Sequence, residues 1–360
     1  MNGAMHVGVF QLLPQPETVS DREVIEQALW EADFADAAGY DSVWVTEHHL
    51  SPFGLIGAPS VYAAALAQRT RRIRIGYAVA VVPLHHPLRL AEELLWVDHL
   101  SEGRLLVGVG PGFSAYEFGA FGVPLEERHG RLDEGLEILR SAFASPSLSH
   151  SGRYWTIPAV TPKPRPYSKT GPPLFRAISS VESLRRAAAE GTPVMLGLKS
   201  IGEIAELVAL YREVRARLGR TPGQIDDEVA ELRVLRRIVV GASDQEALAQ
   251  AHQALAWERE TARRVHEAGP PSRTPPTLAD GSQVAAATSL EGGCVGTPAT
   301  VREGLLELHA LGIRHVIAWM NFGDLPYASV RASMELMATR ILPELTTLDP
   351  LHAAMVAARS

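Results

Sequence analysis

Short runs of apolar residues alternate along the chain with longer segments in which apolar residues recur every three or four positions. The short runs are typical of strands buried on both faces, and the longer segments are typical of amphipathic helices. We expect strands at residues 6–12, 42–46, 73–82, 105–109, 174–178, 193–196, 231–240 and 314–320. The helices expected between and after them cover residues 20–39, 60–70, 87–100, 126–143, 183–190, 201–218, 244–266, 298–311 and 329–342.

Strands that each lead into a helix predict parallel strands joined by helical crossovers. The first helix has clear limits, because Ser20 and Glu23 form a capping box and Gly39 ends it. Eight such units predict an α/β fold of the TIM-barrel type, (β/α)8, with a doubly wound open sheet as the alternative.

Two segments interrupt this regularity. Residues 145–173, after the fourth helix, are rich in Pro, Ser and Gly, and we expect one short hairpin there around Tyr154 and Trp155. Residues 267–293, after the seventh strand, contain two Pro-Pro pairs and little periodicity, which is typical of a lid, a binding loop or disorder. We treat residues 1–360 as a single barrel domain with these two insertions.

Composition narrows the functional classes. With 46% hydrophobic and 21% charged residues, the 360-residue chain resembles an ordinary soluble enzyme. Its net charge of −7 gives no reason to expect nucleic acid or an anionic membrane as a partner. Cys294 is the only cysteine, and neither a signal peptide nor a membrane-spanning run is visible, so we expect a cytoplasmic protein.

The end of the second predicted strand carries the strongest chemical signal. Residues 42–46 run directly into Glu47, His48 and His49, and Pro and Gly residues then open a loop. The carboxyl ends of strands are where α/β folds place their chemistry. The alternative is purely structural, with one histidine capping the next helix and the other buried in the core.

Other predicted strand ends carry weaker signals. The third strand is followed by residues 83–87 (PLHHP), and the fourth runs into residues 108–112 (GVGPG). The fifth is followed by Ser179, Ser180 and Ser183 at a helix N-terminus, where free N–H groups favour an anion such as phosphate. Plain helix capping by Ser180 explains the same pattern at least as well.

A metal-dependent hydrolase on the same barrel is a poorer hypothesis. His48 and His49 are adjacent, so on an extended strand their side chains point to opposite faces and do not chelate one ion easily. No His-x-His pair or further cluster of carboxylates and histidines stands at the predicted strand ends, so we expect no metal site.

Taken together, these segments resemble the bacterial luciferase-like superfamily of flavin-dependent monooxygenases. The resemblance covers almost the whole chain and rests on the order and spacing of several motifs. These are VTEHHLSPFG (residues 45–54), GYAVAVVPLHHPLRLAE (76–92), SEGRLLVGVG (101–110), GTPATV (296–301) and ILPEL (341–345). The resemblance implies a barrel that binds reduced FMN at its carboxyl-terminal mouth.

The resemblance also implies roles for particular residues. His48 is expected beside the flavin as an acid/base or hydrogen-bonding partner of a C4a-peroxyflavin, with His49 in support. Ala78 and Val79 match a non-proline cis peptide under the flavin ring. The remaining cofactor-binding residues implied are Glu47, Gly110, Ser179, Ser180 and Ser183, and those expected to line the substrate pocket are Gln11, Tyr116 and Trp319. Residues 267–293 match a mobile lid.

One departure affects the choice of cofactor. The luciferases place a phosphate-binding arginine where this chain has Pro111, which offers neither charge nor an N–H group. Enzymes that use the deazaflavin F420 for hydride transfer belong to the same superfamily, and nothing at the strand ends excludes them. A non-catalytic flavin-binding relative is a third hypothesis, although two retained imidazoles argue against it.

The leading hypothesis is a two-component monooxygenase that acts with O2 on a small organic substrate such as an aldehyde or a secondary metabolite. We see no G-x-G-x-x-G fingerprint for a nicotinamide after a strand, which fits reduced flavin that arrives from a separate reductase. Relatives usually dimerise through their second and third helices, so the resemblance implies a homodimer.

Overall fold

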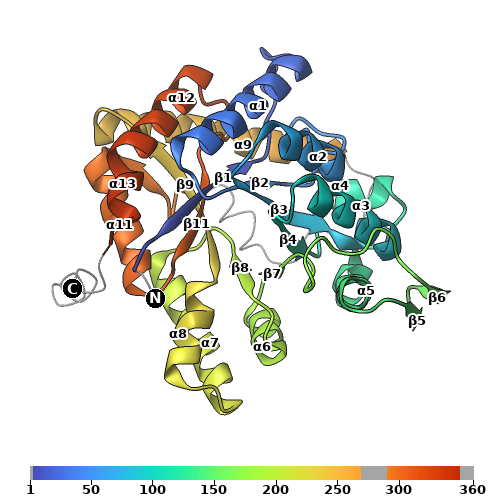
Figure 1. Cartoon of the computed structure of the whole chain (residues 1–360). Helices are drawn as coiled ribbons and strands as arrows, with labels where there is room; N and C mark the ends of the chain where they lie inside the picture. Colours follow the sequence, from blue (N-terminus) through green and yellow to red (C-terminus); the bar gives the residue numbers. More distant parts are fainter. Residues whose placement is uncertain (1–2, 269–289, 349–360) are drawn as a thin grey trace.

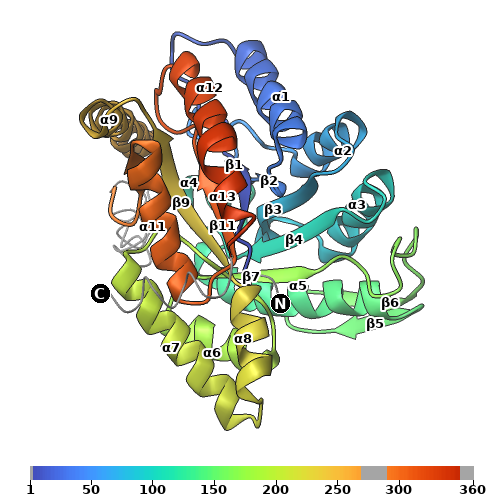
Figure 2. The same ribbon diagram turned by 60° about the vertical axis from the view of Figure 1, so that its left-hand side comes forward.

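The eight predicted strands form a closed barrel. The computed structural model of the chain describes residues 3–268 and 290–348 (Figure 1). Neighbouring barrel strands are parallel throughout, and the pairings of β11 with β1 and of β8 with β9 leave no open edge. A doubly wound sheet would keep two edges, so that alternative is wrong. Figure 2 shows the strands in the middle with the helices around them.

The strand boundaries agree with the predicted runs to within two residues. The barrel strands are β1 (His6–Gln11), β2 (Ser42–Val45), β3 (Arg74–Val81), β4 (Leu105–Gly110), β7 (Leu174–Ile178), β8 (Val194–Leu196), β9 (Arg233–Val240) and β11 (His315–Trp319). This agreement follows from burial on both faces, because most of the strands then appear in the sequence as nearly continuous apolar runs; β9 is the exception, with the buried Arg233, Arg236 and Arg237.

The outer helices were also predicted, apart from several short ones. They are α1 (Asp21–Ala38), α2 (Pro59–Arg69), α3 (Pro87–Leu100), α5 (Arg128–Ala144), α6 (Val181–Glu190), α7 (Ile201–Arg217), α9 (Asp244–Ala268), α11 (Pro298–Ala310) and α12 (Tyr327–Leu336). The segments not predicted include α4 (Ala115–Ala120), α8 (Pro222–Ala230), α13 (Leu342–Leu345) and the short strand β10 (Cys294–Gly296).

The inside of the barrel is filled by large side chains that need glycines opposite them. Trp44 on β2 is fully buried and meets Phe175 edge to face, with ring centroids 6.1 Å apart. A Cβ atom on Gly76 would come within 2.2 Å of the Trp44 ring, and one on Gly8 would come within 2.9 Å. The two glycines therefore make room for the indole, and the barrel is a packed core with its open chemistry at the rim.

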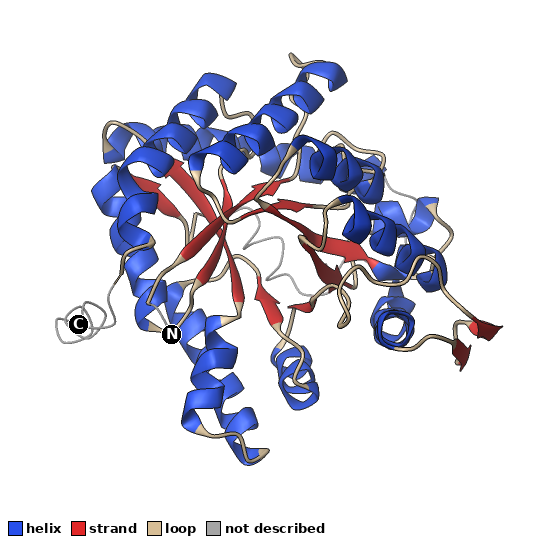
Figure 3. Ribbon diagram, viewed as in Figure 1, coloured by secondary structure: helices blue, strands red, loops and turns tan. Residues whose placement is uncertain are grey.

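The first insertion contains the predicted hairpin. Strands β5 (Leu148–Ser151) and β6 (Thr156–Val160) pair antiparallel around Tyr154 and Trp155, and they project from the side of the barrel in Figure 3. Glu134 on α5 anchors the turn by accepting hydrogen bonds from the N–H groups of residues 153–155. Most of the second predicted insertion, residues 269–289, lies outside the described residues.

Candidate active site

The carboxyl ends of β2 and β3 bring one buried carboxylate against two imidazoles. Glu47 lies two residues after the end of β2, and its Oε1 atom lies 3.0 Å from His49 Nε2 and 2.7 Å from His85 Nε2. Its other oxygen accepts the backbone N–H of Val81 at 2.7 Å. The side chain of Glu47 is inaccessible to solvent, so these groups replace its hydration completely.

The charge on this cluster follows from its hydrogen bonds. Burial alone would raise the pKa of Glu47, but the bonds from His49, His85 and the Val81 N–H lower it to about 2. Burial also opposes the charged form of His85, yet the Glu47 carboxylate raises the pKa of that imidazole. Glu47 is therefore ionised at neutral pH and fixes the orientation of both rings. Within the described residues, no group of three or more His, Cys, Asp or Glu side chains is arranged to hold a metal ion.

A second carboxylate holds His48. Glu117, on the short helix α4, places Oε1 3.1 Å from His48 Nδ1 and 3.0 Å from the backbone N of His49. The side chain of Glu117 is 5% exposed and that of His48 is 14% exposed. One carboxylate oxygen thus fixes both the ring of His48 and the turn of the chain that carries it.

One nitrogen of the His48 ring is not held by the described residues. Its Nε2 atom has no hydrogen-bond partner among residues 3–268 and 290–348. The ring meets Phe53 and Phe113 edge to face, with centroids 5.1 and 5.8 Å away, and Phe113 is partly exposed. The arrangement leaves one imidazole nitrogen available to a molecule that lies against two aromatic rings.

The backbone beside this site has the conformation that the resemblance implied. The peptide bond between Ala78 and Val79 is cis. Gly110, at the end of β4, lies directly against Val79, because a Cβ atom at Gly110 would come within 2.6 Å of a Val79 methyl group. The structure therefore brings Ala78, Val79 and Gly110 together on neighbouring strands.

The three predicted phosphate-binding serines lie at the start of α6. Ser180 is the N-cap residue and forms a capping box with Ser183. The Ser183 hydroxyl accepts the N–H groups of Ser179 and Ser180 and donates to the Ser180 carbonyl. Helix capping, the alternative that the sequence left open, is thus observed, and a role for these serines in phosphate binding stays a prediction.

The three predicted pocket residues lie in different places. Gln11 is buried, and its side chain points outward to the Ala28 carbonyl of α1 and to Tyr62, so it lies between barrel and helices and away from the mouth. Tyr116 lies on α4 and is partly buried. Trp319 is buried at the end of β11, 5.1 Å from the Phe10 ring.

Sequence reasoning missed two residues of this cluster. His85 stands in the segment noted after the third strand, but only the tertiary fold shows that it reaches Glu47. Glu117 stands in a Ser-x-x-Glu pattern with Ser114, which signals a helix start and would have predicted α4. In the structure its carboxylate does not cap the helix and instead meets the two histidines.

This geometry, a closed barrel with a histidine and carboxylate cluster at its mouth, is that of a cofactor-dependent TIM-barrel enzyme. Residues 5–315 match the family model of the luciferase-like monooxygenases, so the chain belongs to this family of flavin-dependent monooxygenases and F420-dependent oxidoreductases.

Individual relatives agree with this assignment. The chain is 32% identical over 341 residues to the uncharacterized protein y4wF of Sinorhizobium fredii, covering 92% of this chain and 96% of that one. It is 24% identical over 365 residues to the oxygenase component of a flavin-dependent trigonelline monooxygenase from Acinetobacter baylyi, covering 97% and 99%. The solved structure of the monooxygenase RslO1 from Streptomyces bottropensis superimposes with a TM-score of 0.80 at 27% identity, covering 94% of this chain and 99% of that one.

More distant structures share the fold with different cofactors. The oxygenating constituent of 3,6-diketocamphane monooxygenase from Pseudomonas putida, solved with FMN, has a TM-score of 0.74 at 20% identity and covers 96% of this chain and 99% of that one. An F420-dependent secondary alcohol dehydrogenase has a TM-score of 0.72 at 18% identity and covers 96% and 100%. Both likenesses concern the fold alone, so the choice between flavin and deazaflavin depends on the site. No helix in the described part of the chain is long and apolar enough to cross a membrane.

Proposed function

We propose that this protein is the oxygenase of a two-component system. It takes reduced FMN from a separate reductase and uses O2 to oxygenate a small organic molecule. The observation that carries the proposal is His48, whose Nδ1 is fixed on Glu117 while its ring packs against Phe53 and Phe113 at the carboxyl end of β2. The Acinetobacter baylyi relative is named as the oxygenase component of a flavin-dependent monooxygenase, which supports the hypothesis of a two-component system.

The residues at the mouth fit a planar flavin with a phosphate tail. Gly110 lies so close to Val79 that a side chain there would occupy the surface beside the cis peptide, and we propose that the flavin ring lies on this surface. The N-terminus of α6, with Ser180 and Ser183, offers N–H groups and hydroxyls to the phosphate. Reduced flavin, when bound, supplies the electrons with which O2 is activated.

The chain's own contribution is to hold a proton and to exclude water. Because Glu117 bonds to Nδ1 of His48, the proton that His48 exchanges with the bound molecules is the one at Nε2. Phe53 and Phe113 cover the ring on either side and reduce the access of water to this nitrogen. His49, bonded to Glu47, keeps the backbone of the site in place.

Hydride transfer with F420 is the second candidate function, and Pro111 favours it. An arginine at this position would supply a cation for the FMN phosphate, and proline supplies none. FMN binding then depends on the uncharged groups at the start of α6.

Anaerobic titration of the protein with reduced FMN and, separately, with reduced F420 distinguishes the two functions. We expect tight binding of reduced FMN, followed by O2 uptake and a transient change in the flavin absorbance when the complex meets aerated buffer. Binding of reduced F420 alone, without O2 uptake, would contradict the proposal and assign the protein to the hydride-transfer branch.

A further inference from the structure

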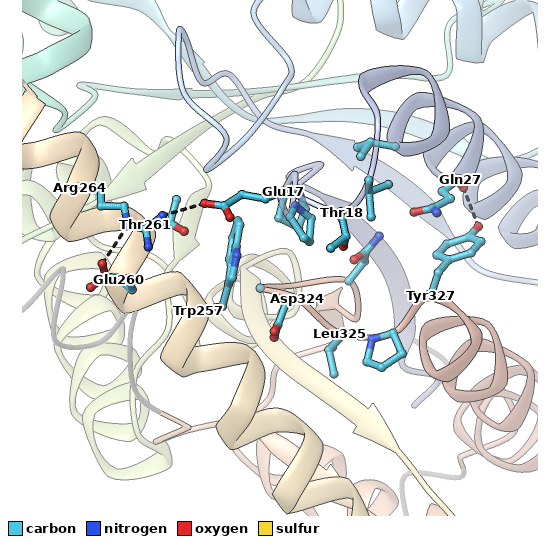
Figure 4. Close-up of a pocket in the computed structure, with 17 residues that line it drawn as sticks. Glu17, Thr18, Gln27, Trp257, Glu260, Thr261, Arg264, Asp324, Leu325 and Tyr327 are labelled. Atoms are coloured by element: carbon cyan, nitrogen blue, oxygen red, sulfur yellow. Dashed lines mark hydrogen bonds and ion pairs between the residues drawn. The ribbon is translucent and has the colours of Figure 1, made fainter.

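A cavity of about 390 Å³ lies at the rim of the barrel, and it shares no lining residue with the His48 cluster. Its walls come from the β1–α1 loop and α1, from α9, and from the β11–α12 loop (Figure 4). Volumes of this size are typical of pockets for small molecules. Its polar lining residues include Thr18, Gln27, Thr261 and Asn321.

The charges that line this cavity are mostly negative. They are three carboxylates, Glu17, Glu260 and Asp324, and one guanidinium, Arg264. Arg264 is already shared, because it lies 2.8 Å from Glu17 and 2.8 Å from Glu260 (Figure 4). Asp324, in contrast, forms no ion pair with a cation in the described part of the chain.

One carboxylate oxygen of Asp324 also lacks a hydrogen-bond donor. Its Oδ1 atom is buried and has no donor among the described residues. Asp324 as a whole is only partly buried and lines the cavity, so a bound molecule meets a carboxylate for which the described residues provide neither this donor nor an ion-pair partner. The carboxylate at this position is therefore best satisfied by a cation that carries N–H groups.

The backbone next to Asp324 is fixed against α9. Gly323 has a φ of +60° and lies so close to Ala254 that a Cβ atom at this position would come within 2.1 Å of the Ala254 carbonyl oxygen. Trp257 is three residues further along α9, on the same face of the helix, and lines the same cavity. The contact thus holds together the two segments that carry Trp257 and Asp324, and both residues line the cavity.

We propose that this cavity binds a small organic cation, a molecule with an ammonium or guanidinium group on an apolar body. Asp324 accepts the N–H groups of the cation, and Trp257 offers it an aromatic face. The amide and hydroxyl groups of Gln27, Asn321 and Thr18 surround the rest of the molecule. The inference goes beyond the proposed oxygenase function and does not depend on it.

The test measures binding to the flavin-free protein, so its result is independent of the oxygenase proposal. Isothermal titration at low ionic strength compares benzylamine, which is cationic at neutral pH, with the neutral isostere benzyl alcohol. We expect the amine to bind at least tenfold more tightly than the alcohol. Equal affinities, or no binding of the amine at millimolar concentration, would overturn the proposal.

Two variants locate the site. Asp324→Asn keeps the shape of the side chain and removes its charge, so the preference for the amine should disappear. Asp226→Asn on α8, far from the cavity lining, is the matched control and should keep the preference. An amine preference that survives in Asp324→Asn would place the cation elsewhere and overturn the proposal. The comparison of the two ligands on the unmodified protein holds even if that variant fails to fold.

Discussion

His48 depends on a residue 69 positions away in the sequence. Glu117 accepts from the imidazole and from the next backbone N–H with one oxygen, so it sets both the ring orientation and the local chain path. Glu47, His48 and His49 were predicted to lie together because they are consecutive and end a buried strand. The contact of Glu117 with them could not be predicted, because the Ser114–Glu117 pattern signals only the start of a short helix and the contact joins segments 69 positions apart.

His48→Ala should leave the binding of reduced flavin largely intact and lower turnover by about a hundredfold or more, because an acid/base group is removed. Glu117→Gln should lower turnover by about tenfold or more with a smaller change in KM, since the ring of His48 loses its charged partner but keeps its chemistry. Steady-state kinetics and a flavin titration on both variants provide the measurement.

His86→Ala is the matched control, because this neighbouring histidine is exposed and its side chain makes no capping bond. Its turnover should equal that of the unmodified protein. Unchanged turnover in His48→Ala would show that His48 takes no part in the reaction. A loss of flavin binding as large as the loss of turnover would show that its role is structural.

Elements of the fold follow local rules closely. The capping boxes at Ser20, Ser180, Ser200 and Thr221 each begin a helix, and left-handed glycines end α1 and α6. These signals involve residues three positions apart, so they are readable without any tertiary information. Helices α8 and α4 were missed even though Thr221 with Gln224 and Ser114 with Glu117 carry their start signals, because both helices are too short to show a clear periodic pattern.

Ser20→Ala and Ser180→Ala separate capping from phosphate binding. Each change removes one capping box and should lower the free energy of unfolding by about 1 kcal/mol. If α6 holds the flavin phosphate, Ser180→Ala alone should weaken the binding of reduced FMN by about tenfold and leave the binding of reduced riboflavin, which lacks the phosphate, unchanged. Urea unfolding and anaerobic titrations measure the two effects.

Ser20→Ala serves as the control, since it alters an equivalent capping box on α1. Equal affinity of Ser180→Ala and the unmodified protein for reduced FMN would restrict Ser180 to capping.

At the scale of the whole molecule, barrel closure buries carboxylates that the sequence does not mark as buried. Glu31 on α1 is fully buried and accepts from Asn321 at 2.7 Å and from Gln11 at 3.3 Å. Burial raises the pKa of Glu31 to about 7 despite these bonds, and burial raises that of Glu258 to about 7 despite its Arg237 partner. Gln11, the last residue of β1, points outward for a related reason, because its side chain donates a hydrogen bond to the buried Glu31.

These raised pKa values determine whether the free energy of unfolding rises or falls with pH. Between pH 4.5, the ordinary value, and about 7, folded Glu31 and Glu258 hold protons that the unfolded chain has lost. The two carboxyls therefore make the free energy of unfolding fall as pH rises through this window, by at most about 3 kcal/mol for each group. Glu31→Gln should remove roughly half of that decrease, as measured by urea unfolding at several pH values.

Glu26→Gln on the same helix is the control, because Glu26 is exposed and paired with Arg22 at the surface. It should retain the full pH dependence. A slope in Glu31→Gln equal to that of the control would show that Glu31 is ionised in the folded protein throughout this range.

The sequence alone determined the eight strands, most of the helices and the α/β class, because apolar patterns and helix caps are visible within short stretches of chain. The closure of the sheet into a barrel was favoured by the sequence and decided by the tertiary structure. The sequence also placed Glu47, His48 and His49 at a strand end. Only the tertiary structure decided that Glu117 and His85 complete this cluster and that Gln11 faces outward. The position of Asp324 beside α9 was likewise decided only by the tertiary structure. Such contacts join segments far apart in the chain, and their geometry is set by how the barrel closes and how its loops pack.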